Sequence, residues 1–204
     1  IDIIVRGEGE ETIREIAQGK NLKEILGISY QEDGRIVHNP NRPLPPLDTL
    51  QYPDRKLRRA TYHANSKGVK YLNAKFDTVL TARGCPYNCK FCNFSMNPLG
   101  QRRYYSARAP ESVVAEIRSL DAEIIFLADE NFCVDPQRTE RICDLLIAQR
   151  VKKKFFAFVR IEIVKYPTLL KKLEQAGVQI LFIGVESPHD RILHHLNKGF
   201  TSQE

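Results

Sequence analysis

Residues 76–92 read FDTVLTARGCPYNCKFC, and this stretch decides both the fold and the site. The apolar run Phe76 to Leu80 predicts a buried strand. It leads directly into three thiols in a C-x-x-x-C-x-x-C spacing, which are Cys85, Cys89 and Cys92. Glycine and proline among them favour a tight loop. Structural zinc sites and cubane ferredoxins use four protein ligands, so three thiolates predict a metal centre with one position open to a substrate or cofactor.

At these residues the chain resembles the radical S-adenosylmethionine superfamily, whose motif has this spacing and an aromatic residue, here Phe91, before the third cysteine. The resemblance implies that each cysteine ligates one iron of a 4Fe-4S cluster, while S-adenosylmethionine chelates the fourth iron through its amino and carboxylate groups. One electron then cleaves that cofactor to methionine and a 5′-deoxyadenosyl radical. The partners so implied are a small-molecule substrate and an electron donor such as flavodoxin or ferredoxin.

A zinc site is the alternative interpretation of the three thiols. A distant side chain such as His63 or Cys133 would then supply the fourth ligand. Such a non-catalytic zinc or iron–sulfur module would serve binding or electron transfer, and it assigns no role to the polar residues described below.

Composition indicates a globular protein. The chain has 204 residues, of which 42% are hydrophobic, enough for a real core. No apolar run approaches the roughly 18 residues of a membrane span, and no signal-peptide pattern opens the chain. The five cysteines, an odd number, fit a reducing compartment better than a disulfide framework. We therefore expect a cytoplasmic protein.

The chain is basic, with a formal net charge of +6. This charge is compatible with nucleic acid or another anionic partner. No aromatic and basic recognition motif accompanies it, so we expect a solvated basic face rather than a nucleic-acid surface. The basic positions gather at Arg55, Lys56, Arg58 and Arg59, at Lys67 and Lys70, and at 152–154.

The first part of the chain predicts a short strand over 1–5 and a short helix that ends near Gly19. Residues 5–13, VRGEGEETI, are similar to the segment that follows the cobalamin-binding domain in cobalamin-dependent radical enzymes. We therefore expect 1–19 to be the end of an upstream cobalamin-type α/β domain and the chain to be a fragment. The D-x-H-x-x-G motif that supplies the lower axial histidine is absent, which leaves cobalamin binding open.

Residues 20–72 predict a hairpin and a linker. Asp33-Gly34 lies between two β-prone runs, a strong local hairpin signal. The following stretch, 39–46, is too rich in proline for a helix or a central strand and should be extended. The structure of 47–70 stays open.

From residue 73 the pattern becomes four strand–helix repeats, which predict right-handed crossovers and a parallel sheet. Periodicity cannot choose between a barrel and an open doubly wound sheet. The resemblance implies a partial (β/α) barrel of the radical S-adenosylmethionine type, with about four of six units over 73–204. The expected strands are 76–80, 124–128, 155–159 and 180–185, and the expected helices begin at Pro110, Pro136, Pro167 and Pro188.

Each expected strand ends in polar or cysteine-bearing residues, and the carboxyl ends of parallel strands are where ligands collect. The resemblance implies cofactor contacts for six of these residues: Phe91 for adenine, Asp129, Glu130 and Asn131 for the amino group, Arg160 for the carboxylate and Glu186 for the ribose. We expect Cys85, Asp129, Arg160 and Glu186 to open onto one edge and to ring one cavity, with the outer edge of the fourth strand unpaired.

Structural roles compete with several of these assignments. Arg160 could instead form an ion pair with Glu162 or Asp129, and Ser187 is a good helix cap before Pro188. Cys143 falls on the apolar face of a predicted helix, where a core residue is expected. Cys133 follows the second strand and is more consistent with an inert position.

The favoured function is therefore that of a radical S-adenosylmethionine enzyme of the cobalamin-linked class, which includes cobalamin-dependent methyltransferases, that functionalises a C–H bond by methyl transfer or ring formation on an unknown substrate. The alternatives are a methylthiotransferase-like radical enzyme that acts on RNA and the non-catalytic module above. The first alternative needs a second set of three cysteines, and none precedes Cys85.

Overall fold

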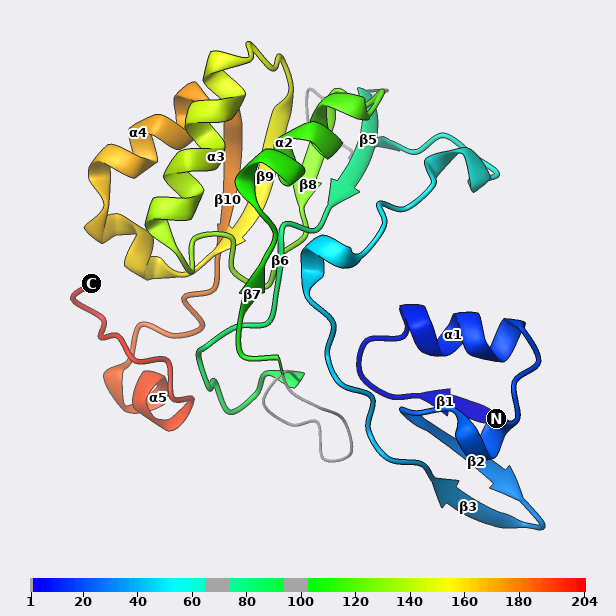
Figure 1. Ribbon diagram of the computed structural model, residues 1–204. Coiled ribbons are helices and arrows are strands. Elements are labelled where there is room, and N and C mark those ends of the chain that lie inside the picture. The colour runs from blue at the N-terminus through cyan, green and yellow to red at the C-terminus, as the bar shows by residue number, and fades with distance from the viewer. Residues whose placement is uncertain (1, 65–73, 94–102) are drawn as a thin grey trace. The chain divides into compact units, whose positions relative to one another are not determined.

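The computed structural model describes residues 2–64, 74–93 and 103–204 (Figure 1). Two compact units make up the chain, one of Ile1–Pro45 with Asn88–Arg103 and the other of Pro46–Tyr87 with Tyr104–Glu204. The basic positions Lys67 and Lys70 lie outside the described residues. Within these described ranges, no helix has both the length and the apolar character needed to cross a membrane.

The smaller unit contains a three-stranded antiparallel sheet in the order β1-β2-β3 (Figure 1). Its elements are β1 (Ile3–Val5), α1 (Glu10–Ala17), a 3-10 turn (Leu22–Glu24), β2 (Ile28–Glu32) and β3 (Arg35–His38). The predicted hairpin is confirmed, since β2 and β3 pair around Asp33 and Gly34, both of which have positive φ, 48° and 74°. Such φ values are what a two-residue hairpin turn requires.

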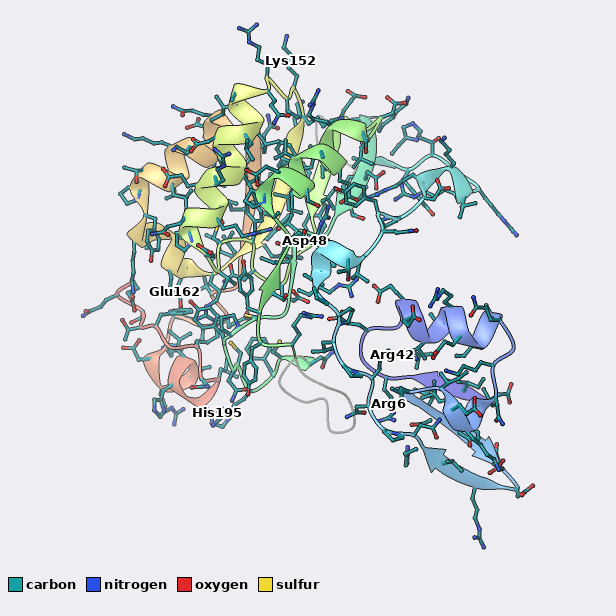
Figure 2. All side chains as sticks on the ribbon, viewed as in Figure 1. Arg6, Arg42, Asp48, Lys152, Glu162 and His195 are labelled. Carbon is teal, nitrogen blue, oxygen red and sulfur yellow. The ribbon has the colours of Figure 1, made fainter. Side chains whose placement is uncertain are left out.

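The same unit joins segments that the sequence assigned to different domains. β1 pairs with β2, so 1–19 and the hairpin share one sheet and one small core around Ile25, Ile28 and Tyr30. The Asn39 amide donates to the carbonyls of Leu22 and Ile25, each at 2.7 Å. Arg6 and Arg42, labelled in Figure 2, bind Asn41 and Thr12 through side-chain hydrogen bonds of 2.6 and 2.9 Å. The start of the expected linker is therefore held by polar contacts within this unit.

The larger unit is built on a five-stranded sheet in the order β10-β9-β8-β5-β4. The predicted strand order is confirmed: β5, β8, β9 and β10 are parallel neighbours, and β10 is the outermost of the described strands. The short strand β4 pairs antiparallel with β5 at the opposite edge. The strands are β4 (His63–Ala64), β5 (Ala74–Val79), β8 (Ile124–Leu127), β9 (Lys154–Val159) and β10 (Val178–Ile183).

Three helices cover one face of this sheet (Figure 1), and each begins with proline at its first position, where the missing N–H is not needed. They are α2 (Pro110–Ser119), α3 (Pro136–Ala148) and α4 (Pro167–Gln175). Asp135 caps α3 by accepting from the Arg138 N–H at 3.0 Å. The main core lies between these helices and the sheet, where each fully buried aliphatic or aromatic side chain contributes about 1.5–3 kcal/mol; it includes Ile117, Ile125, Leu127, Ile142, Phe155 and Leu173.

The segment before the sheet, whose structure the sequence left open, packs on the same unit through charged contacts. It contains two 3-10 turns, Leu47–Thr49 and Arg55–Leu57. Arg55 binds Glu116 at 2.6 Å, and Glu116 is only 1% exposed. Arg58 binds both oxygens of Asp77, at 3.0 and 2.7 Å. Two of the basic positions thus neutralise buried carboxylates, and they do not form a solvated surface.

Asp48, labelled in Figure 2, fixes this segment to the start of α2. Its carboxylate accepts from the N–H of Ala109, the N-cap residue of α2, at 3.0 Å. The negative charge of the carboxylate also lies near the positive N-terminal end of the helix dipole, which is a favourable interaction. The expected linker therefore ends near residue 45, where the larger unit begins.

We expect Gly177→Ala to destabilise the larger unit by about 2–3 kcal/mol. Gly177 joins α4 to β10 with φ +98°, and an added Cβ would overlap the Lys153 carbonyl oxygen. The control is Gly19→Ala, where φ is +72° and no atom lies within 4 Å, so only the backbone term of about 1 kcal/mol applies. Urea unfolding of both variants measures the difference. Equal losses of stability would show that the overlap is relieved at no cost.

Candidate functional site

A two-stranded ribbon carries the chain away from the sheet and back. β6 (Ala82–Arg83) pairs antiparallel with β7 (Ser106–Ala107), directly after β5 and before α2. The cysteine segment begins at Gly84, whose φ of +84° suits a turn that glycine adopts readily. Because the ribbon follows the end of β5, which is parallel to β8, it lies at the carboxyl edge of the parallel strands.

The cysteines are thiols, and all five of them lie in the described ranges without forming a disulfide. Cys89 is 8% exposed, while Cys85 and Cys92 are partly buried. The Cys92 N–H donates to the Cys89 carbonyl at 3.1 Å, so a turn brings these two positions together. Three thiolates are the donor chemistry that an iron–sulfur cluster requires, and in this respect the residues fit the implied group.

The unit boundary falls inside the cysteine segment. Cys85 belongs to the larger unit, and Cys89 and Cys92 belong to the smaller one. Among the residues that the structure describes, no group of three or more His, Cys, Asp and Glu side chains is gathered to hold a metal ion. The three cysteines therefore stay a prediction as cluster ligands.

The side chains considered for a zinc site lie in unsuitable places. His63 on β4 is paired with Lys75, at the start of β5, whereas Cys85 follows the end of that strand. Cys133 packs against the main core, and burial raises the pKa of its thiol to about 12. These positions argue against either residue as the fourth ligand of a zinc site.

Asp129 follows β8 and is only 1% exposed. Its carboxylate accepts hydrogen bonds from the N–H groups of Thr81 and Ala82, at 2.6 and 3.1 Å, and from the Thr81 hydroxyl. Burial raises the pKa of the Asp129 carboxyl, and these hydrogen bonds oppose the rise. The expected ring of four side chains around one cavity thus does not form as predicted, because Asp129 turns inward to hold the end of β5.

Glu130 and Asn131 also contact the protein itself. An Oε2 atom of Glu130 accepts from the Gly84 N–H at 3.1 Å, one residue before Cys85. Asn131 is buried, and its Oδ1 accepts from the Cys133 N–H at 3.3 Å. Of the triplet that the sequence assigned to the cofactor amino group, Asp129 and Glu130 therefore anchor the base of the cysteine segment, while Asn131 binds the loop after β8.

Arg160 follows β9 and forms the ion pair that the sequence left open. Its Nη2 donates to Glu162 at 2.7 Å, and its Nε lies 3.1 Å from each oxygen of that carboxylate. The guanidinium carbon lies 3.7 Å from the centre of the Tyr87 ring. Glu162, labelled in Figure 2, follows the end of β9, and Lys152, labelled at the top of that view, precedes its start.

Among the four charged residues that were expected to contact the cofactor, Glu186 is the most exposed. It follows β10 with φ +69°, a left-handed conformation that is rare without a glycine. Its carboxylate lies 3.4 Å from Lys198 Nζ, and Lys198 is 5% exposed. Phe91 is 48% exposed. Ser187 accepts from the His189 N–H at 3.1 Å, but α5 (Asp190–His195) begins two residues after Pro188 and its N-cap is His189, which forms no side-chain cap hydrogen bond, so Ser187 does not have its predicted capping position.

Sequence reasoning missed the basic residues that hold this edge together. Arg138 on α3 donates to the carbonyls of Thr81 and Arg108, at 2.8 and 3.0 Å. In the smaller unit, Arg103 binds Glu8 at 2.9 Å, so the GEGE segment contacts the chain beyond the third cysteine. No spacing rule links these positions, which are far apart in sequence.

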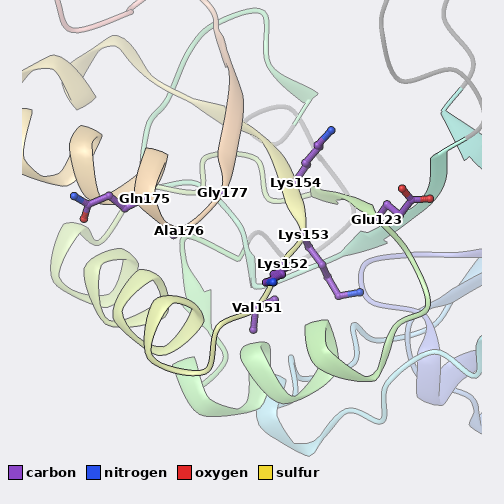
Figure 3. A pocket seen from close by; sticks show the side chains of 8 residues that line it. All are labelled: Glu123, Val151, Lys152, Lys153, Lys154, Gln175, Ala176 and Gly177. Atoms are coloured by element: carbon purple, nitrogen blue, oxygen red, sulfur yellow. The ribbon is translucent and has the colours of Figure 1, made fainter.

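The lysine run lies away from this edge. Lys152, Lys153 and Lys154 line a pocket of about 400 Å³ where β9 begins, together with Glu123 and Gly177 (Figure 3). Lys153 donates to the carbonyls of Leu120 and Ala122 at 2.7 and 2.6 Å, and burial lowers its pKa. The ammonium group of Lys153 is thus held by carbonyl groups that follow the end of α2.

We expect Cys143→Ala to keep its iron content while losing about 1 kcal/mol of stability. Cys143 is fully buried in the main core, and burial raises the pKa of its thiol to about 12. Iron analysis after anaerobic reconstitution, together with urea unfolding, measures both quantities. Loss of iron in this variant would mean that the ligand set is misassigned.

A comparison with known protein families finds a match for most of the larger unit. A sequence model of the Radical SAM superfamily matches residues 79–204. The chain is 32% identical over its whole length to an uncharacterized methyltransferase of Pyrococcus horikoshii, covering 44% of that protein. It is 28% identical, over 98% of its length, to an anaerobic magnesium-protoporphyrin IX monomethyl ester cyclase of Synechocystis, covering 40% of that protein. The chain thus spans less than half the length of these relatives.

Two solved structures share the fold. The cobalamin-dependent S-adenosylmethionine radical enzyme OxsB matches 98% of the chain with a TM-score of 0.67 and 23% identity, over 30% of its own chain. The radical S-adenosylmethionine methyltransferase TsrM of Kitasatospora setae matches 98% of the chain with a TM-score of 0.68 and 19% identity, over 41% of its own chain. The predicted partial barrel is therefore confirmed, with helices on the outer face of a sheet whose four longer strands are parallel.

Proposed function

Because the chain belongs to the radical SAM superfamily, we propose that it is the cluster-binding part of an enzyme that functionalises a C–H bond by methyl transfer or ring formation. Methyltransferases and cyclases among the relatives support both reaction types. The substrate is a small molecule of unknown identity. An electron donor of the flavodoxin or ferredoxin type supplies the electron that reduces the cluster.

One observation carries this proposal. The C-x-x-x-C-x-x-C segment leaves the carboxyl edge of the sheet through the β6–β7 ribbon, and Glu130 anchors its first residues. Cys85, Cys89 and Cys92 would hold a 4Fe-4S cluster whose remaining iron takes S-adenosylmethionine. Such a cluster, once bound and reduced, would supply the electron for reductive cleavage of S-adenosylmethionine to methionine and for hydrogen-atom abstraction from the substrate.

The residues of this chain divide into two groups in that site. Glu130 and Asp129 orient the cysteine segment through Gly84 and Thr81. Glu186 remains the candidate for the ribose hydroxyls, because its carboxylate is partly exposed at a strand end and Lys198 fixes its position. Phe91, exposed within the cysteine segment, remains the candidate for the adenine ring.

Cobalamin belongs to the proposal as a cofactor of the longer protein. The chain aligns over nearly its whole length, including residues 1–45, with proteins that bind cobalamin according to their structures. The VRGEGEETI segment lies in this part, and Glu8 within it binds Arg103. The class that best accommodates these features is the cobalamin-linked one.

The experiment is anaerobic reconstitution of the full-length protein with iron and sulfide, followed by reduction with dithionite and addition of S-adenosylmethionine. We expect about four irons and four sulfides per chain, and formation of methionine and 5′-deoxyadenosine. Cys92→Ala should reduce product formation at least about 100-fold, because two thiolates do not retain the cluster. Wild-type protein that binds one zinc and forms neither product would contradict the proposal.

A further inference from the structure

Arg160 is enclosed by aromatic rings. Its guanidinium carbon lies 3.7 Å from the centre of the Tyr87 ring and 5.7 Å from the centre of the Phe200 ring. The side chain is 10% exposed. The short distance to Tyr87 places the plane of the guanidinium against the ring face, an arrangement in which a cation is attracted by the aromatic quadrupole.

The edge of the same guanidinium is engaged by oxygen atoms of the protein. Nε and Nη2 form a fork onto the Glu162 carboxylate, with Nε 3.1 Å from Oε2 and Nη2 2.7 Å from Oε1. Nη2 also donates to the Lys198 carbonyl. This fork is the geometry with which arginine binds a free carboxylate, so it is already used within the chain.

Tyr87 is the second residue between Cys85 and Cys89. Its ring is 37% exposed, so packing of the core does not fix it. Arg160 contacts this ring and is itself held by Glu162. A series of side-chain contacts therefore runs from the residues that follow β9 to the middle of the cysteine segment.

We infer that Arg160 is a positioning residue for the cysteine segment, which it orients through Tyr87, and that it does not bind the carboxylate of S-adenosylmethionine. This inference rests on the proposed function, because it assigns the segment to a cluster. It replaces the role that resemblance implies for Arg160. Glu162 shares this positioning role, since it holds the Arg160 guanidinium against the Tyr87 ring.

The test compares Tyr87→Ala, Tyr87→Phe, Arg160→Ala and the double variant in the full-length, reconstituted protein. The readouts are the midpoint potential of the cluster and the dissociation constant of S-adenosylmethionine. Tyr62→Ala is the matched control: it removes another arginine–tyrosine contact, with Arg58 at 5.5 Å, away from the cysteines. Tyr87→Phe keeps the ring and loses only the hydroxyl, so it should shift the potential less than Tyr87→Ala.

We expect Tyr87→Ala and Arg160→Ala to shift the midpoint potential in the same direction, and the double variant to shift it no further than the larger single effect. The affinity for S-adenosylmethionine should change less than about twofold in both, and Tyr62→Ala should change neither readout. An Arg160→Ala variant with an unshifted potential would overturn the inference. So would a more than tenfold loss of S-adenosylmethionine affinity in Arg160→Ala that Tyr87→Ala does not share. If the wild-type protein binds no cluster on reconstitution, the proposed function is contradicted, and this inference is contradicted with it.

Discussion

Replacing Cys89 with alanine is expected to abolish the iron–sulfur cluster and all cleavage of S-adenosylmethionine. Three protein thiolates are the fewest that hold a cubane with one open iron, so two leave it unprotected. Cys89 is also the most buried of the three cysteines, at 8% exposure, and it accepts the Cys92 N–H through its carbonyl. That hydrogen bond involves only the backbone, which allows the turn itself to survive the substitution.

Iron content, visible absorption and 5′-deoxyadenosine formation are the measurements for this variant. The matched control is the Cys143→Ala protein, which removes one sulfur from the core and should keep the cluster. Unfolding curves of the two proteins separate a loss of ligand from a loss of fold. A Cys89→Ala variant that retains about four irons per chain would contradict the ligand assignment.

Asp129→Ala is expected to destabilise the larger unit by about 3–5 kcal/mol. The substitution leaves two N–H groups and a hydroxyl of the buried pair Thr81 and Ala82 without their acceptor. These residues connect β5 to the β6–β7 ribbon, so the cysteine segment loses its base as well. Urea unfolding measures the stability, and iron content measures the consequence for the segment.

Asp129→Asn separates this structural role from a role in cofactor binding. Asparagine keeps the Oδ1 acceptor that receives both N–H groups, so we expect a loss of only about 1 kcal/mol. The affinity for S-adenosylmethionine should change less than about twofold, because the carboxylate faces the protein. A loss of affinity above tenfold in a stable Asp129→Asn protein would restore the contact to the cofactor amino group that resemblance implied.

The sequence was sufficient for the four parallel strands and three covering helices of the larger unit because local signals agreed there. Proline at the first position of α2, α3 and α4 and apolar runs in β5, β8, β9 and β10 located the elements within a few residues. Parallel order followed from the crossover helices, which return every strand in the same direction. The carboxyl edge, and with it the position of the cysteine segment, could therefore be derived before any coordinates.

The details of the site could not be derived in the same way, since they depend on pairs of residues distant in sequence. Asp129 looked like a ligand residue because it follows a strand, yet its partner Thr81 lies 48 positions away. Arg55 and Arg58 looked like surface charge, yet Glu116 and Asp77 draw them inward. A charged residue in a sequence does not reveal whether its partner is solvent, a cofactor or another side chain.

The domain boundaries were also difficult for the sequence to place. The proline-rich stretch indicated a linker, but β1 pairs with β2 and Asp48 caps α2, so both ends of the stretch are tied to folded parts. The cysteine segment itself is divided between the two units. No composition signal marks that division, because it follows from contacts and not from local preference.

Electron paramagnetic resonance of the reduced full-length protein tests the central claim most directly, namely that three thiolates leave one iron of the cluster open to S-adenosylmethionine. We expect the signal of a reduced 4Fe-4S cluster whose g values change when S-adenosylmethionine is added, because the cofactor enters the coordination of that iron. S-adenosylhomocysteine with added methionine is the control, because this mixture lacks the sulfonium group of S-adenosylmethionine. A protein with no such signal, or with a signal that S-adenosylmethionine leaves unchanged, would contradict the account.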